Sequence, residues 1–375
     1  ELEVYLAAVQ YPGRRLRKVE ESSSPLMAGP YLQRTAEGQW VVMMETRPGQ
    51  AAPVLRWGSS HGAVDRPLEG AYHDNYWAFA LPPEANACDT AYYQPVINGE
   101  AGPIAAIARR ESVPFTFTAW GDSQGGWRVF REHNRQMAQS HPHFTIGLGD
   151  LVDDGVNTWQ WRAMLHCLQP LASQSPVYFI PGNHDYDGYY DSLYSANYHR
   201  YSAWPNYYSW VYGNAIFLAL DPNQNFPLGI DSTQEHWLET VIQSEPWRNA
   251  RWRFVLLHQP PYAQGWPGYH GDGFIRQLAD SLAEPAGIDF VLSGHCHDFE
   301  RLTKNYGRQQ THFIVLGGAG GSLEPPESSD APVMDKVVKD YHYGQFRVGH
   351  EKVSFQAIGL DGQLLDDITF EKRQP

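Results

Sequence analysis

The sequence predicts an α/β domain preceded by a small all-β sandwich. The chain has 375 residues, which is enough for two or three domains. From about Pro25 to Ile107, short alternating runs are broken by Gly and Pro, which is typical of a β-sandwich, with an irregular loop region as the alternative. After Arg110, apolar strand-like runs alternate with helical patterns, as they do in α/β domains. We expect an N-terminal extension over 1–25, the sandwich over 26–110 and the α/β domain over 111–375.

The elements of the α/β domain follow from the spacing of the apolar residues. Amphipathic faces predict helices over 161–168 and 237–242. The second helix should begin at a capping box, Ser232-Thr-Gln-Glu235. The tail, 346–370, reads as strands with Asp361-Gly362 as a hairpin turn. Apolar runs predict strands at 113–119, 144–148, 177–180, 215–220, 253–257, 288–292 and 312–316.

Composition narrows the function classes. Lys and Arg number 28 and Asp and Glu 42, so the net charge is −14 and no nucleic-acid-binding footprint is expected. No apolar run approaches the ~18 residues that a membrane span requires. Three cysteines (Cys88, Cys167, Cys296) do not make a disulfide framework, and a single Cys88–Cys167 bridge stays open. The composition indicates no oligomeric state.

Five of the predicted strands run directly into residues that can bind metals. Because ligands bind at the carboxyl ends of strands in open α/β sheets, we expect these side chains on one rim. Carboxylate, amide oxygen and imidazole together suit iron, zinc or manganese. Neighbouring glycines let backbone and metal approach closely. The five strand ends are Gly121-Asp122, Gly149-Asp150, Gly182-Asn183-His184-Asp185, His258 and Gly294-His295-Cys296-His297.

This order of motifs resembles the calcineurin-like metallophosphoesterases, and within them the purple acid phosphatase branch. The branch is suggested by the run from Gly294 to Arg301 and by His258-Gln-Pro-Pro-Tyr262. Gly29-Pro-Tyr-Leu-Gln33 and Trp57-Gly58 resemble the fibronectin type III-like sandwich of that branch. The resemblance covers 26–370. It implies a catalytic domain built as a sandwich of two β-sheets flanked by helices.

The resemblance also implies a dinuclear phosphoester hydrolase whose nucleophile is a metal-bound hydroxide. Asp150 would bridge two metal ions drawn from iron, zinc and manganese. His184 would lie just off the metals and stabilise the transition state or protonate the leaving group. The substrate would be a phosphomonoester or phosphodiester, and the location periplasmic or secreted. The other ligands would be Asp122 and His297 for the first metal, and Asn183, His258 and His295 for the second.

The sequence departs from its family at the first metal. The purple branch has a tyrosine three residues after the bridging aspartate, where this chain has Asp153. Other metallophosphoesterases have a histidine two residues after the first aspartate, where this chain has Gln124. A third carboxylate would add negative charge to a site meant to receive phosphate. We therefore favour Gln124 as a ligand, directly or through water, and Asp153 as part of the surrounding loop.

Aromatic residues gather after the Asn183-His184 motif, between Tyr186 and Trp210. An aromatic wall could stack a base, a sugar or an aryl group, with a loop packed by its own aromatics as the alternative. Tyr186 and Tyr262 are the candidate substrate-binding residues, and Trp266 with Tyr269 could line the other side.

Two other functions compete with this hypothesis. Trp120-Gly-Asp-Ser123 resembles the Gly-Asp-Ser esterases, but the late Asp-x-x-His pair that would activate Ser123 occurs nowhere in the chain. A non-catalytic metal-dependent binding protein is the other alternative. The complete ligand set argues against it.

Overall fold

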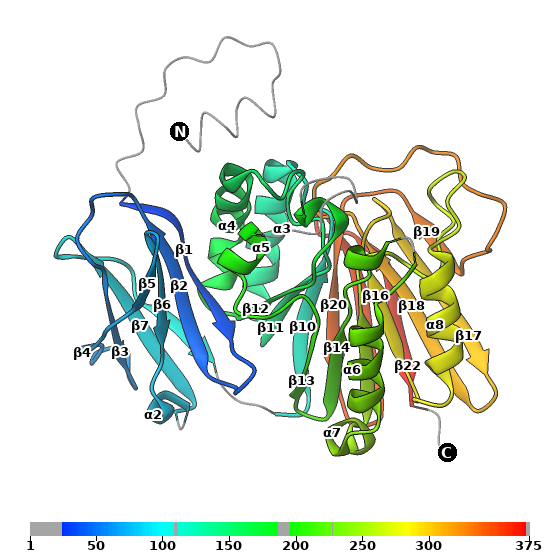
Figure 1. Ribbon diagram of the computed structural model, residues 1–375, viewed down its shortest axis with the longest axis horizontal. Coiled ribbons are helices and arrows are strands. Elements are labelled where there is room, and N and C mark those ends of the chain that lie inside the picture. The colour runs from blue at the N-terminus through cyan, green and yellow to red at the C-terminus, as the bar shows by residue number, and fades with distance from the viewer. Residues whose placement is uncertain (1–24, 87, 109–111, 187–195, 227, 373–375) are drawn as a thin grey trace, which may run out of the picture.

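The computed structural model describes residues 25–372, except 87, 109–111, 187–195 and 227. The expected extension over 1–25 therefore lies outside the described residues, apart from Pro25. Figure 1 shows the N-terminal sandwich beside the α/β part of the chain. Among the described residues, no helix has the length and apolar character needed to cross a membrane.

The N-terminal region is all-β, with one short helix, and is consistent with a fibronectin type III-like domain. Two sheets enclose a core that includes Val42, Met44, Trp57 and Phe79. One sheet has the order β1 (Leu26–Arg34), β2 (Trp40–Thr46), β6 (Tyr76–Ala80), β5 (Ala71–His73). The other has the order β4 (Arg66–Leu68), β3 (Val54–Gly58), β7 (Thr90–Ile97), β8 (Glu100–Ala101), with β9 (Ala105–Ala108) paired to β7 and α2 at Pro83–Asn86.

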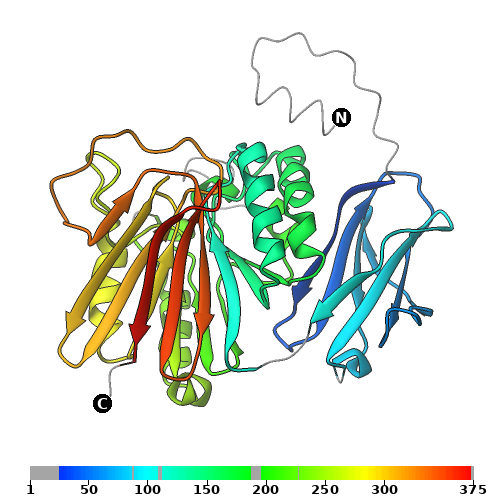
Figure 2. The same ribbon diagram turned by 180° about the vertical axis from the view of Figure 1, so that it is seen from behind.

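The α/β part contains two further sheets. Strands β10 to β12 are parallel, and so are β14, β15, β16 and β18. The six-stranded sheet has the order β12 (Val177–Phe179), β11 (Phe144–Gly147), β10 (Phe115–Trp120), β20 (His342–Val348), β21 (Lys352–Gly359), β22 (Leu364–Glu371). The seven-stranded sheet has the order β13 (Tyr208–Tyr212), β14 (Ala215–Ala219), β15 (Trp252–Leu256), β16 (Phe290–Ser293), β18 (Gln309–Leu316), β17 (Phe299–Tyr306), β19 (Lys336–Val338). Seen from behind in Figure 2, β20 to β22 lie at the front in orange to red.

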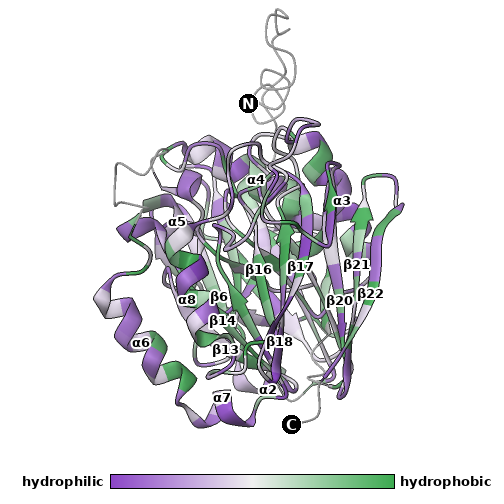
Figure 3. Ribbon diagram, turned by 90° about the vertical axis from the view of Figure 1, so that its right-hand side faces the viewer, coloured by the Kyte–Doolittle hydropathy of each residue, from purple (hydrophilic) through white to green (hydrophobic). Residues whose placement is uncertain are grey.

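An aromatic core joins these two sheets. The ring of Phe117 stacks on Phe144 at 5.1 Å and on Phe346 at 4.6 Å, and Phe217 and Phe254 from the other sheet meet its edges. Helices cover the outer faces of the seven-stranded sheet and of β10 to β12, and in Figure 3 α6 carries hydrophilic residues with hydrophobic ones between them. The helices are α3 (Trp127–Gln139), α4 (Thr158–Ala172), α5 (Ala196–Tyr201), α6 (Ser232–Ile242), α7 (Glu245–Asn249) and α8 (Gly273–Ala283), with single turns at Asn183–Asp185 and Asn223–Asn225.

Most predicted elements are confirmed, and three details differ. All seven predicted strands and both helices are present, but the capping box is wrong, because Asp231 rather than Ser232 accepts the Gln234 N–H, at 2.8 Å. The elements that the sequence analysis did not predict include the long helices α3 and α8 and the strands β13, β17 and β19. The open Cys88–Cys167 bridge is not made, since both cysteines are unpaired and Cys167 Sγ lies 3.5 Å from the Trp127 carbonyl.

The sandwich and the α/β part share a buried polar contact. Glu45 on β2 is 1% exposed and accepts hydrogen bonds from Arg162 on α4, at 2.8 and 2.9 Å. It also accepts from Arg200 and from the Tyr201 hydroxyl on α5, each at 2.9 Å. Tyr31 on β1 donates to the Tyr201 carbonyl at 2.8 Å. The sandwich is thereby joined to the helix that follows the Asn183-His184 motif.

Candidate metal centre

The predicted metal-binding residues follow strands of both sheets. Asp122, Asp150 and Asn183 follow β10, β11 and β12 of the six-stranded sheet. His258 follows β15 of the seven-stranded sheet, and His295 and His297 follow β16. Because neighbouring strands in each set are parallel, their carboxyl ends meet at one edge. The distances below show which of these side chains come together.

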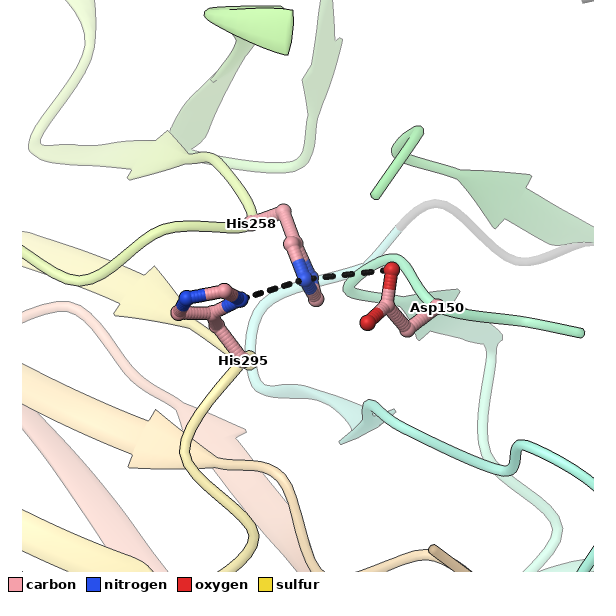
Figure 4. A group of neighbouring side chains, drawn as sticks. All are labelled: Asp150, His258 and His295. Atoms are coloured by element: carbon pink, nitrogen blue, oxygen red, sulfur yellow. Dashed lines mark hydrogen bonds and ion pairs between the residues drawn. The ribbon is translucent and has the colours of Figure 1, made fainter. Parts of the chain in front are cut away.

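Asp150, His258 and His295 form one tight group (Figure 4). Their candidate ligand atoms all lie within 4.8 Å of one another. His258 Nε2 is 3.2 Å from Asp150 Oδ1 and 3.2 Å from His295 Nδ1. His258 Nδ1–H donates to the Leu148 carbonyl at 2.8 Å, which leaves Nε2 as the nitrogen that can bind a metal. Burial lowers the pKa of His295 to about 3, and the nearby His258 adds to this shift, which favours the neutral imidazole.

Asp122 and His297 form a second pair. His297 Nε2 lies 3.5 Å from Asp122 Oδ1, and His297 Nδ1 lies 2.6 Å from the Ser322 carbonyl, to which it donates. This repeats the arrangement of His258, in which a backbone carbonyl selects the tautomer. Burial raises the pKa of Asp122, although His297 and His258 oppose that shift.

Asp150 has two further partners besides His258. Its Oδ1 accepts the His184 backbone N–H at 2.9 Å, in addition to facing His258. Its Oδ2 accepts a hydrogen bond from Gln124 Nε2 at 2.7 Å. Burial would raise the pKa of Asp150, but the charge and hydrogen bond of His258 outweigh it and hold that pKa below its ordinary value. Gln124 is thus placed beside the carboxylate that was expected to bridge.

The surroundings of Asn183 indicate whether metal ions fit among these side chains. The residue is 4% exposed, and within the described part of the chain its Oδ1 has no hydrogen-bond partner. Leaving a buried amide oxygen unpaired costs roughly 1–3 kcal/mol, and a bound cation removes that cost. Two carboxylates, an amide oxygen and three imidazoles are donors for iron, zinc or manganese. The residues present therefore fit metal ions.

The ligand loops approach one another more closely than side chains would allow. A Cβ on Gly182 would lie 2.2 Å from the Asp150 nitrogen, and one on Gly294 would lie 2.5 Å from Asp122 Oδ2. Asp122, Asp150 and His295 adopt positive φ angles of 61°, 49° and 72°. Such angles are unfavourable for residues with a side chain and gather at functional sites.

One residue that sequence reasoning left without a role supports the loops. Asp185 is fully buried, and its Oδ1 accepts the N–H groups of Leu151 and Val152 at 2.8 and 3.2 Å. Its Oδ2 accepts the Gly182 N–H at 2.8 Å. The carboxylate thereby joins the loops that carry Asp150 and Asn183. The only available signal was its place in the Asn183-His184-Asp185 run.

The main chain of Asp153 holds the candidate catalytic histidine. His184 Nδ1 lies 2.7 Å from the Asp153 carbonyl, and the Asp153 N–H donates to Gln160 Oε1 at 2.8 Å. This placement agrees with Asp153 as part of the surrounding loop.

The hydroxyl groups of the two candidate substrate-binding tyrosines and of Ser123, the nucleophile of the esterase alternative, form hydrogen bonds to other groups of the protein. Tyr186 is 2% exposed and bonds to Asp221. The Tyr262 hydroxyl donates a hydrogen bond of 2.6 Å to Asp280, a residue of α8. Ser123 is fully buried and donates to the Leu151 carbonyl at 2.6 Å. The contact of Ser123 speaks against it as a nucleophile, whereas a substrate role for the ring of Tyr186 or Tyr262 stays a prediction.

A cavity of about 590 Å³ lies at the other, amino ends of β15 and β16. Cationic residues line it, but Arg253 donates to the carbonyls of Trp247 and Arg248 at the end of α7. Lys372 pairs with Asp289 at 2.6 Å. These cations have structural partners, and we assign the cavity no ligand.

Comparison with known proteins shows which family the central part of the chain matches. Residues 115–299 match the family model of the calcineurin-like phosphoesterases. Purple acid phosphatase 21 of Arabidopsis thaliana is 24% identical over 69% of this chain and 63% of its own length. The probable inactive purple acid phosphatase 1 of the same plant is 24% identical over 60% of this chain and 42% of its own length. The chain therefore spans about two-fifths to three-fifths of these relatives.

Solved structures show the same fold. The purple acid phosphatase PPD1 of yellow lupin (Lupinus luteus) aligns with a TM-score of 0.74 at 16% identity, over 91% of this chain and 74% of the other. PhoD aligns with a TM-score of 0.70 at 13% identity, over 94% of this chain and 90% of the other. Residues 115–299 thus form a calcineurin-like phosphoesterase domain, and purple acid phosphatases are among the relatives of the chain.

Proposed function

We propose that this chain is a metal-dependent phosphoester hydrolase with a dinuclear centre. The observation that carries the proposal is the buried, unpartnered Asn183 Oδ1, which lies in a set of candidate ligands where His258 and His297 each bind a backbone carbonyl through Nδ1. The calcineurin-like family match and the purple acid phosphatase relatives support the same reaction class.

The proposed ligands divide into two sets that share one carboxylate. Asp150 would serve both metals, because Oδ1 faces His258 and Oδ2 faces Gln124. Metal ions bound in this way polarise phosphoryl oxygens and supply hydroxide from water near neutral pH. Gln124 completes the first set directly or through water, in place of the histidine and tyrosine of related enzymes. The first set is Asp122, Asp150, His297 and Gln124, and the second is Asp150, Asn183, His258 and His295.

His184 is the proposed acid–base residue. Its backbone N–H binds Asp150, so the imidazole is carried by the same turn that holds the bridging carboxylate. Its Nδ1 is directed at the Asp153 carbonyl, which assigns proton exchange with the leaving group to Nε2. Its role is therefore to stabilise the transition state or protonate the leaving oxygen, without binding a metal.

No side chain among the described residues of the site offers itself as a nucleophile. Ser123 Oγ is engaged with the Leu151 carbonyl. Cys296 is fully buried, and burial raises the pKa of its thiol, which disfavours the reactive thiolate. Attack by water-derived hydroxide needs neither residue.

Metal analysis and hydrolysis assays on the same protein test this proposal. We expect two ions per chain, drawn from iron, zinc and manganese, and chelator-sensitive hydrolysis of phosphomonoesters or phosphodiesters. Asp150→Ala should lose both, whereas Ser123→Ala should keep both. Activity that resists chelation but is lost in Ser123→Ala would favour the esterase alternative. Bound metal without hydrolysis would favour the non-catalytic binding protein, and a trapped covalent phosphoenzyme would contradict direct attack.

We also propose that the protein works in the periplasm or is secreted. The support is the resemblance of its motifs to a largely exported branch. Immunodetection in exported and cytoplasmic fractions of producing cells tests this, and a purely cytoplasmic signal would contradict it.

A further inference from the structure

An aromatic pair lies directly against one of the proposed metal ligands. The ring centroid of Trp266 is 5.4 Å from that of His295, and the Tyr269 centroid is 5.3 Å from the same imidazole. The two aromatic rings lie 5.1 Å apart. Tyr269 packs on the small apolar cluster of Ala263, Cys296 and Val315, whereas Trp266 remains 37% exposed. Tyr269 therefore acts as the support, and Trp266 presents the accessible ring.

The loop that carries Trp266 is held in place by buried polar groups. The fully buried Glu300 accepts the N–H groups of Gln264 and Gly265 at 2.7 and 3.0 Å. Ser329 Oγ accepts the Gly268 N–H at 2.9 Å and lies 3.2 Å from the Trp266 carbonyl, to which it donates. A binding surface that is already ordered loses little conformational entropy when a ligand arrives.

The close approach of this loop to the metal-ligand segment fixes where the indole lies. A Cβ on Gly265 would come within 1.5 Å of Asp298 Oδ2, so only glycine lets the loop lie against the residue that follows His297. The backbone of the loop at Gly265 and the backbone of the segment at Asp298 therefore fix the Trp266 indole beside His295. A large exposed aromatic ring in such a fixed position suits stacking with a flat group of a ligand.

We propose that Trp266 is the platform for a planar aromatic ring of the phosphoester substrate, so that the site prefers aromatic over aliphatic phosphoesters. This inference rests on the proposed function. The ring could be attached directly to the ester oxygen, as in an aryl phosphate, or one sugar away, as in a nucleotide. Both use the same stacking chemistry, and both can be tested with defined compounds.

Binding of two phosphonates to the metal-loaded protein tests the platform apart from turnover, because a C–P bond is not cleaved by phosphoester hydrolysis. Calorimetric titration should show that Trp266→Ala weakens phenylphosphonate binding about tenfold. Ethylphosphonate should change by less than about twofold, and Trp266→Phe should restore most of the affinity for phenylphosphonate. Tyr72→Ala is the matched control, since Tyr72 is an aromatic that is 57% exposed on β5 of the N-terminal sandwich.

Hydrolysis then identifies the position of the ring. The ratio of kcat/KM between Trp266→Ala and wild type is compared for phenyl phosphate, a ribonucleoside 5′-monophosphate and ethyl phosphate. A larger loss for either ring-bearing ester than for ethyl phosphate supports the platform and shows where the ring sits. Equal losses for phenyl- and ethylphosphonate, or a loss of bound metal in Trp266→Ala, would show that Trp266 only positions His295. Failure of metal-loaded wild type to hydrolyse any ester overturns the proposed function itself, whereas hydrolysis without ring dependence overturns only this inference.

Discussion

Glu45→Gln should weaken the buried contact between the N-terminal sandwich and the α/β part, and so lower the free energy of unfolding of the protein. The substitution keeps the shape of the side chain but removes the charge that Arg162 and Arg200 bind. Glu45 is 1% exposed, and the two guanidinium groups are 15% and 17% exposed. The change therefore leaves the nearly buried Arg162 without its carboxylate, while Arg200 keeps Asp74 as its partner at 3.0 Å.

The expected destabilisation is about 3 kcal/mol. Breaking one partner of a buried ion pair costs about 3–5 kcal/mol, because the other charge stays buried without compensation. The lower end applies here, since the residual exposure of both arginines lets water reach them. Glu132→Gln is the matched control, because Glu132 and Arg135 form a pair at 3.5 Å with both side chains largely in solvent. That surface pair should contribute less than about 1 kcal/mol.

Acid should remove the same stabilisation from the wild type. Burial alone would raise the pKa of Glu45, but the hydrogen bond and charge of Arg162, the hydrogen bond of the Tyr201 hydroxyl and the charge of Arg200 hold that pKa below its ordinary value. A carboxylate with a lowered pKa stabilises the folded state above its unfolded pKa of about 4.3, and this contribution is lost as the pH falls through the folded value. The stability difference between wild type and Glu45→Gln should thus be constant near pH 7 and shrink in acid.

Urea unfolding between pH 3.5 and 7, followed by circular dichroism, measures both effects. The refuting result is a Glu45→Gln protein that unfolds within about 0.5 kcal/mol of wild type at pH 7, which is the size expected of an ordinary surface substitution. A difference that grows in acid would refute the pH argument alone.

Further predictions concern the metal centre. His184→Ala should slow turnover by roughly 10²–10⁴-fold while elemental analysis finds the metal content unchanged, and loss of metal would instead make His184 a ligand. Gln124→Ala should empty the first metal site more readily than Asp153→Ala under dialysis, and the reverse order would exchange their roles. Gly182→Ala should lose metal and activity together, because its Cβ would lie 2.3 Å from Asp150 Oδ1; an active, metal-loaded protein would contradict the close approach described above.

The proposed ligands could be chosen from the sequence because each of them directly follows an apolar strand, and parallel strands bring their carboxyl ends together. Where a strand ends depends on nearby residues. The position at a strand end could therefore be predicted for Asp122, Asp150, Asn183 and the three histidines. Helix α3 was missed although its pattern is also local, because Trp127, Phe130 and Met137 are spaced along one helical face. Only the burial of two polar residues on that helix, His133 and Asn134, depends on contacts that the sequence does not show.

Contacts between distant segments could not be predicted. Nothing near Glu45 in the sequence indicates that Arg162 and Arg200, more than a hundred residues away, will surround it. The same holds for Tyr186 and Tyr262, whose place next to site motifs suggested a substrate role. Their hydroxyls bind Asp221 and Asp280, two partners that proximity along the chain did not indicate.

The arrangement of the ligands explains why this fold can hold a strained site. One sheet contributes Asp122, Asp150 and Asn183, and the other contributes His258, His295 and His297, so the proposed centre lies where the two sheets meet. The aromatic core below fixes the distance between the sheets and cannot readily adjust, because close-packed interiors resist changes in volume. That rigidity can maintain positive φ angles at three ligands and a buried, unpaired amide oxygen at a fourth. A bound metal ion would give the unpaired amide oxygen a partner and would also join the two sheets of the α/β part. Occupancy of the proposed centre would therefore be coupled to the stability of the α/β part.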